Sequence, residues 1–103
     1  MIHMRLMAIF VKNLMNMPMT LFQCPCCDYF SLKDRGEYSI CKLCFWEDDG
    51  RNPDQLDVYS GPNHMTLREG RHNFQAFGAC DRRMLKSVLP ATERARFAHQ
   101  SRA

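Results

Sequence analysis

The sequence lacks a long apolar run and a strong excess of either charge. The apolar stretch at residues 6–11 ends at Lys12, well short of the roughly 18 residues that indicate a membrane-spanning helix. No small-residue cleavage site follows it, so we expect neither a membrane span nor a secretory signal. The net charge of +3 over 103 residues is too small to identify a nucleic-acid ligand by itself. We expect one small domain in a reducing cytoplasm.

Cysteine, by contrast, is abundant for a chain of this length, with six residues among 103. Four of them form two Cys-x-x-Cys pairs, at Cys24 and Cys27 and at Cys41 and Cys44, with thirteen residues between the pairs. In a reducing compartment, this doubled spacing is typical of a metal site rather than of disulfides. Zinc prefers four ligands in a tetrahedron, and each pair presents two sulfurs from one tight turn. We therefore predict one structural Zn²⁺ bound by these four thiolates.

Iron in a rubredoxin-like site would use the same four sulfurs, so the spacing alone does not separate the two metals. Zinc is favoured because Asp28 and Phe45 follow the two pairs, where a rubredoxin-like site has glycine. Two cysteines remain. Cys26 is interpreted as a spectator thiol, with replacement of Cys27 as a ligand or a lowered pKa as alternatives, and Cys80 as a small buried residue.

The segments around the cysteine pairs favour short strands. Residues 19–22 approach the first pair as an apolar strand, and residues 28–32 leave it as another. A turn at residues 33–36 contains Gly36, and residues 37–40 alternate polar and apolar side chains as a half-buried strand does. A strand, a turn and a strand between two cysteine pairs predict a zinc-ribbon-like or rubredoxin-like knuckle hairpin.

The residues after about position 65 favour helices instead. Thr66 and Glu69 have the spacing of a capping box, and Gly78 is placed to end the helix that they begin. A second helix is predicted from Asp81, as its N-cap, through Leu89, because Pro90 cannot continue it. The predicted fold class is therefore α+β: a small knuckle hairpin followed by two short C-terminal helices.

The chain ends differ in composition from its middle. Residues 1–19 hold six of the eight methionines and no acidic residue, and we interpret them as an extension outside the domain. Some of their apolar positions would also fit one face of a helix. Residues 20–90 are predicted to form the cysteine-rich domain, and residues 91–103 a basic tail.

Several separated motifs, in this order, resemble the bacterial cysteine-rich CPCC family: the Cys-Pro-Cys-Cys of residues 24–27, residues 41–50, residues 61–63 and residues 73–81. The resemblance covers roughly residues 21–89 and implies a small zinc-binding protein. The chain departs from the pattern in two places. Asp28 stands where such proteins often have glycine, and Gly70 stands where a helix-forming residue is expected.

No catalytic constellation accompanies the predicted metal site, and four cysteines close its coordination shell. We therefore expect a binding module rather than an enzyme, acting by protein–protein contact and used, as one example, in an immunity or antitoxin role. Aromatic and acidic residues follow the second cysteine pair, and they are the candidate interface: Phe45, Trp46, Asp48 and Asp49. Burial of Trp46 in the core is the competing interpretation.

Two other functions fit parts of the sequence. Basic residues near the C-terminus offer phosphate contacts to a nucleic acid, with a solvated charged face as the simpler interpretation: Arg82, Arg83, Lys86, Arg94 and Arg96. A thiol-redox or metal-handling protein would instead use Cys26.

Overall fold

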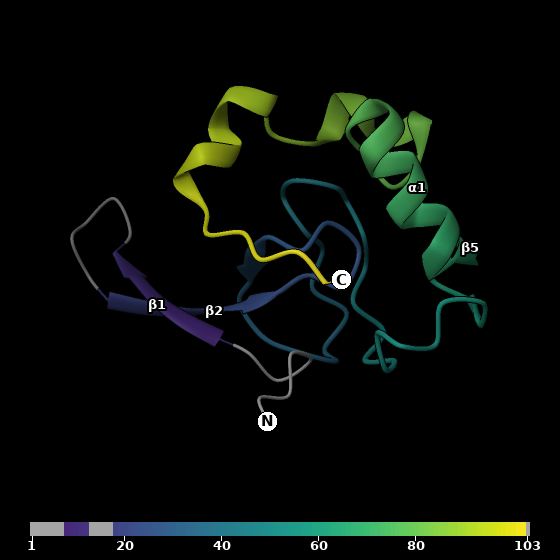
Figure 1. Cartoon of the computed structure of the whole chain (residues 1–103), viewed down its shortest axis with the longest axis horizontal. Coiled ribbons are helices and arrows are strands. Elements are labelled where there is room, and N and C mark those ends of the chain that lie inside the picture. Colours follow the sequence, from purple (N-terminus) through teal and green to yellow (C-terminus); the bar gives the residue numbers. More distant parts are fainter. Residues whose placement is uncertain (1–7, 13–17, 103) are drawn as a thin grey trace.

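A computed structural model describes residues 8–12 and 18–102 of the chain. The described part contains a three-stranded sheet, a two-stranded sheet, one α-helix and two 3₁₀ helices (Figure 1). Both sheets are antiparallel. The predicted α+β class is therefore confirmed. No helix in this part of the chain has the length and apolarity that crossing a bilayer requires.

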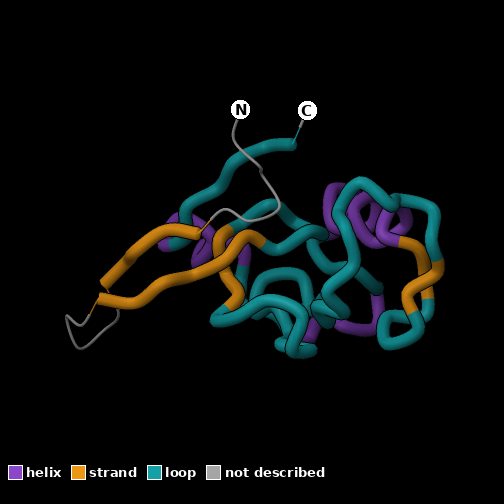
Figure 2. The backbone as a smooth tube through the Cα atoms, turned by 90° about the horizontal axis from the view of Figure 1, so that it is seen from below, coloured by secondary structure: helices purple, strands orange, loops and turns teal. Residues whose placement is uncertain are grey.

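The first sheet has the order β1-β2-β3, with β1 at Ala8–Lys12, β2 at Pro18–Gln23 and β3 at Phe30–Leu32. Figure 2 shows β1 and β2 as a two-stranded ribbon that extends from one side of the molecule. The strands predicted on either side of the first cysteine pair are thus present. The helical interpretation of the N-terminal segment is wrong at Val11, which lies in β1 and pairs with Met19 of β2. The other positions of that helical face, Met4, Met7, Leu14 and Met15, lie outside the described residues.

The hairpin predicted between the cysteine pairs does not form. β3 pairs with β2, whereas residues 37–40 contribute only an isolated bridge from Ile40 to Glu47. Tyr38 has a φ of 61° and is 57% exposed, and Ile40 is 46% exposed. The buried Asp48 carboxylate accepts from the Gly36 N–H, and the Asp48 carbonyl accepts from the Tyr38 N–H. These bonds draw the segment towards the loop after the second pair, which keeps it out of the sheet.

The main helix forms as its local signals predict. β4 (Tyr59–Ser60) and β5 (Met65–Thr66) form a small hairpin that leads into α1 (Leu67–Phe77). The capping box of Thr66 and Glu69 is complete, and Gly78 ends the helix with a φ of 98°. This left-handed conformation costs glycine little.

The second predicted helix is shorter and more tightly wound than expected. It is the 3₁₀ helix η2 (Arg82–Ser87), with Asp81 as N-cap as predicted. Residues 88–89, which were predicted to belong to this helix, lie outside it, and Val88 has extended backbone instead. One cause is that Leu89 precedes Pro90, which disfavours helical backbone there, and another is that the Leu89 N–H donates to the Lys42 carbonyl. A second 3₁₀ helix, η3 (Ala91–Arg96), follows within the predicted basic tail.

The core lies between the cysteine-bearing loops and α1. Six of the eleven buried residues in its main cluster, among the described residues, are cysteines. Trp46 is the largest apolar member, and Gly70 of α1 lies against it. A Cβ at position 70 would be 2.8 Å from Cζ3 of Trp46, closer than atoms of a packed core approach. Gly70 therefore lowers helix propensity but lets α1 lie directly on the indole ring.

Candidate metal centre

Both Cys-x-x-Cys pairs form tight backbone turns of the same kind. The N–H of Asp28 donates to the carbonyl of Cys24 at 3.0 Å, and the N–H of Phe45 donates to the carbonyl of Cys41 at 2.9 Å. Asp28 and Phe45 have φ values of 69° and 72°. These two residues therefore adopt the left-handed conformation that favours glycine. Asp28 and Phe45 thus stand where a rubredoxin-like site has glycine, but they adopt the same backbone conformation, so the turns themselves are retained.

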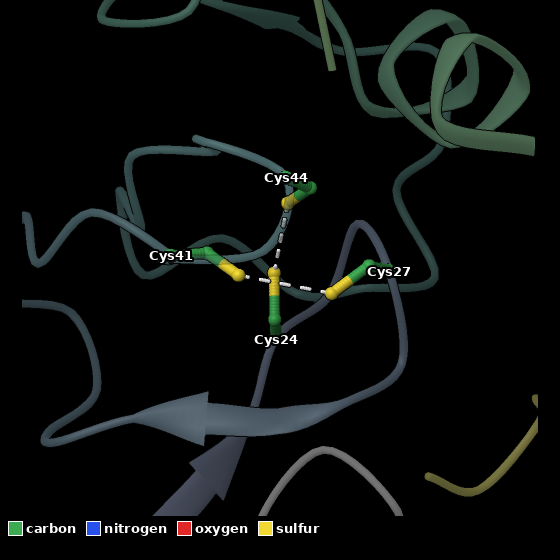
Figure 3. A group of neighbouring side chains, drawn as sticks. All are labelled: Cys24, Cys27, Cys41 and Cys44. Carbon is green, nitrogen blue, oxygen red and sulfur yellow. Dashed lines mark hydrogen bonds between the residues drawn. The ribbon is translucent and has the colours of Figure 1, made fainter. Parts of the chain in front are cut away.

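The two turns bring four sulfurs together. Figure 3 shows the side chains of the four cysteines pointing towards a common centre. All four Sγ atoms lie within 4.8 Å of one another, with 3.6 Å between Cys24 and Cys44 and 3.7 Å between Cys27 and Cys41. A tetrahedral ion with sulfur ligands at about 2.3 Å requires sulfur–sulfur separations of about 3.8 Å. The predicted four cysteines are therefore positioned to bind one metal ion.

Hydrogen bonds from neighbouring residues support the second pair. The N–H of Leu43 donates to the Cys41 sulfur at 3.3 Å, and the N–H of Trp46 donates to the Cys44 sulfur at 3.4 Å. The hydroxyl of Ser31 lies 3.0 Å from the Cys41 sulfur. Donors placed in this way stabilise thiolate over thiol and orient the ligands. β3 thus contributes Ser31 to the centre although it carries none of the cysteines.

Burial disfavours negative charge on most of these thiols in the absence of a cation. It is the main cause that raises the pKa of Cys24, Cys27 and Cys44. Burial also acts to raise the pKa of Cys41, but hydrogen bonds from the three other thiols and from Ser31 outweigh it and place this pKa well below its usual value. A metal ion must displace protons from the site, so metal affinity falls as the pH falls.

An ionic network that the motifs did not predict surrounds the first turn. Asp28 is buried and accepts two bonds from Arg71 of α1, at 2.7 and 2.9 Å. Arg71 also donates to the carbonyl of Pro25 at 2.6 Å, and Arg102 lies 3.6 Å from the Asp28 carboxylate. Four thiolates and one divalent cation carry a net charge of −2. The two guanidinium groups and the Asp28 carboxylate together carry a net charge of +1, which partly offsets this negative centre.

The remaining cysteines are buried and lie outside the four-sulfur group. Cys26 is packed next to Gly70, where a Cβ would approach its sulfur to 3.3 Å. Cys80 donates its N–H to the Cys44 carbonyl at 2.7 Å, and burial raises the pKa of its thiol from 9.0 to about 12. Cys80 is thus the small buried residue that was predicted, and the arrangement gives no support to Cys26 as a substitute for Cys27.

Cys80 is expected to react slowly with iodoacetamide in the folded protein. At pH 8, a thiol with a pKa of about 12 has roughly 1000-fold less thiolate than one at 9.0, and only thiolate reacts. The stability contributed by the neutral thiol is present below pH 9 and is lost as the pH rises towards 12. Mass spectrometry after timed labelling measures this rate. Labelling of Cys80 as fast as a model thiol would show that its environment is open.

The structure buries two of the four residues predicted to form an interface. Trp46 is 2% exposed and Asp48 is 0% exposed, so neither is available to a partner of the folded chain. Asp49 accepts from the Ser60 hydroxyl at 2.7 Å, and Phe45 packs partly against the core cluster. The aromatic and acidic run after the second pair therefore serves mainly to build the loop and the core.

Most of the predicted nucleic-acid contacts are engaged within the chain. The engaged side chains are Arg82 and Arg94, which lie over the rings of Phe77 and Phe74, Arg83, which pairs with Asp81, and Arg96, which pairs with Glu93. Arg83 and Arg96 therefore have acidic partners within the chain, whereas Arg82 and Arg94 contact rings and keep their charge. Arg94 also donates to the carbonyl of Gly78 at 3.4 Å, which supports the C-terminal end of α1.

Comparisons with known proteins agree with the motif analysis. No curated protein and no solved structure matches the chain significantly. The sequence profile of one family, described as cysteine-rich CPCC, matches residues 22–95. This region contains both cysteine pairs, α1 and the two 3₁₀ helices apart from the last residue of η3. The chain therefore belongs to the cysteine-rich CPCC family.

Proposed function

We propose that the protein binds one structural Zn²⁺ through Cys24, Cys27, Cys41 and Cys44. The observation that supports this most directly is the approach of four buried sulfurs to within 4.8 Å of one another. Zinc is favoured because a tetrahedral shell of four thiolates is one of its typical structural sites. The free state of the described cysteines suits a reducing compartment, and we place the protein in the cytoplasm.

The metal in this site stabilises the fold rather than performing chemistry. When bound, it neutralises part of the thiolate charge and joins two segments that are otherwise connected by thirteen residues. All four ligands come from the protein and are buried, so no coordination position is left for a substrate. Small domains commonly use such an ion where the apolar core is insufficient. We therefore propose a binding module and not an enzyme.

Metal content tests this proposal. Native mass spectrometry of protein purified under reducing conditions is expected to give one zinc per chain, and a chelator is expected to remove it with loss of folded structure. Replacement by Co²⁺ is expected to give the visible spectrum of a tetrahedral thiolate site, and purified protein with an iron–thiolate absorption would identify iron instead. Metal-free protein that remains folded would overturn the proposal.

A surface for a protein partner is supported by exposed apolar residues elsewhere on the molecule. Tyr38, Ile40 and Tyr59 are largely exposed. The segment that contains Tyr38 and the strand β4 that contains Tyr59 both bond to the acidic residues after the second cysteine pair. Tyr38 donates its N–H to the Asp48 carbonyl, and Ser60 donates to the Asp49 side chain. Aromatic side chains on a rigid surface are typical anchors of protein interfaces. We propose that this surface, rather than Trp46, is where the module binds another protein.

Site-specific photocrosslinking in cells tests the proposed surface. A photoreactive residue at Tyr38 or Tyr59 is expected to give the same discrete adduct, because both positions would contact one partner. The control is the exposed Gln75 on α1, where no such adduct is expected. Equal crosslinking at all three positions, or none at any, would contradict the assignment of this surface.

A further inference from the structure

The last described residues of the chain return to the first cysteine turn. In Figure 1 the C-terminal segment leads from η3 back across the middle of the molecule. The N–H of Phe30 donates to the carbonyl of Ala98 at 2.9 Å, and the N–H of Gln100 donates to the carbonyl of Asp28 at 3.2 Å. Tyr29 and His99 form an antiparallel bridge, and their rings lie 4.5 Å apart. The C-terminal segment therefore pairs through its backbone with residues 28–30, at the start of β3.

This segment contacts the residues on both sides of the first Cys-x-x-Cys pair. Gln23 immediately precedes Cys24, and its amide nitrogen donates to the carbonyl of Gln100 at 2.6 Å. The amide oxygen of Gln23 accepts from Arg102 at 2.8 and 3.2 Å. Asp28 immediately follows Cys27, and its carboxylate accepts from the backbone N–H of Arg102 at 3.3 Å. The C-terminal segment thus holds the two ends of the turn that carries half of the metal ligands.

Arg102 also contributes charge next to the thiolates. Its side chain is only 13% exposed and lies 3.6 Å from the carboxylate of Asp28. Burial lowers the pKa of Arg102, while the negative charges of Asp28 and Cys24 act to raise it. The guanidinium therefore lies beside the carboxylate of the residue that directly follows Cys27. Its departure would leave a negative centre with one fewer compensating charge.

Hydrogen bonds and an ion pair to residues next to the first cysteine turn hold most of this segment in place. Residues 98–101 are exposed, whereas Phe97 before them packs partly against the core cluster. Segments that bury little apolar surface open at lower free-energy cost than the core. Residues 98–102 can therefore leave the first turn while Phe97 stays in place and the rest of the fold remains intact.

We propose that residues 98–102 form a C-terminal latch that closes over the first cysteine turn and slows the loss of its metal ion. The latch rests on the metal centre proposed above. With the latch closed, Gln23 and Asp28 are held and the Cys24–Cys27 turn cannot widen. With the latch open, Gln23 loses its bonds to Gln100 and Arg102, and Asp28 keeps its bonds to Arg71 but loses that to Arg102. The turn is then held less tightly, so that a competing chelator takes up the ion and protons replace it on the thiolates.

The rate of metal transfer to a chromophoric chelator tests the latch on the zinc-loaded full-length chain. Arg102→Ala is expected to release zinc about tenfold faster, because it removes a charged hydrogen-bonding group that holds the turn. The matched control is Arg96→Ala, which removes an exposed arginine that pairs with Glu93 away from the turn and is expected to change the rate less than twofold. Arg102→Lys retains the charge but not the planar group, so an intermediate rate is expected.

Amide hydrogen exchange reports latch closure independently of metal release. In Arg102→Ala, the N–H groups of Phe30 and Gln100 are expected to lose protection, whereas that of Phe45 is expected to keep it. Gln100→Pro removes the N–H that bonds the Asp28 carbonyl and is expected to speed release in the same direction. If zinc-loaded wild type and Arg102→Ala release metal at equal rates, the latch is overturned and the metal centre stands. If purified wild type holds no metal, the centre and the latch are both overturned.

Discussion

Cys44→Ser is expected to abolish both metal binding and folding. Cys44 is fully buried, and its sulfur lies 3.6 Å from that of Cys24 in the four-sulfur group. Structural zinc contributes about 10–16 kcal/mol of apparent binding free energy in small zinc-dependent peptides. This is comparable with the roughly 5–15 kcal/mol by which small domains are stable. Circular dichroism and metal analysis of the purified variant are expected to show unfolded, metal-free protein.

The matched control for this change is Cys26→Ala. Cys26 is equally a buried cysteine of the first turn, but it lies outside the four-sulfur group. Its variant is expected to retain one metal ion per chain, and any loss of stability then reflects packing against α1. Retention of metal and fold in Cys44→Ser would show that the cysteine cluster is an ordinary core of reduced thiols.

Trp46→Ala is expected to lower the free energy of unfolding of the metal-loaded protein by about 3–5 kcal/mol. The indole ring is 2% exposed and fills the space between α1 and the second cysteine turn. Its removal leaves a cavity, because Gly70 has no side chain with which to occupy it. Urea unfolding followed by circular dichroism measures the loss, since the variant lacks the only tryptophan.

Tyr59→Ala provides the comparison at an exposed aromatic residue. Tyr59 is 57% exposed, so its removal is expected to change the free energy of unfolding by less than about 0.5 kcal/mol. If Trp46→Ala were as mild as Tyr59→Ala, Trp46 would not be the core residue that the packing indicates. The candidate interface around it would then regain support.

Gly70→Ala is the complementary change on the other side of this contact. Alanine raises helix propensity by about 1 kcal/mol, but its Cβ would lie 2.8 Å from the Trp46 ring. Overpacking of this kind costs about 1–3 kcal/mol, so a net loss of up to about 2 kcal/mol is expected. The same substitution at the exposed Gln75 of α1 is expected to be neutral or slightly stabilising. Stabilisation by Gly70→Ala would show that α1 does not depend on this close approach.

Features with local causes were predicted from the sequence. The spacing of Cys24, Cys27, Cys41 and Cys44 is sufficient to identify the four ligands, because each turn is closed by a bond between neighbouring residues. The same holds for α1, whose start at Thr66 and end at Gly78 depend on bonds to residues within the helix itself.

Features that depend on distant residues were decided only by the tertiary structure. The alternating residues 37–40 have a strand pattern, but backbone bonds to Asp48 hold them outside the sheet. In the sequence, Asp28 and Gly70 depart from the pattern of the cysteine-rich CPCC family. In the fold, Asp28 pairs with Arg71 and Arg102, which are 43 and 74 residues away, and Gly70 accommodates Trp46. Sequence spacing determines which side chains are able to bind a metal, whereas the partners of the buried charges and the fit of the core depend on which segments the fold brings into contact.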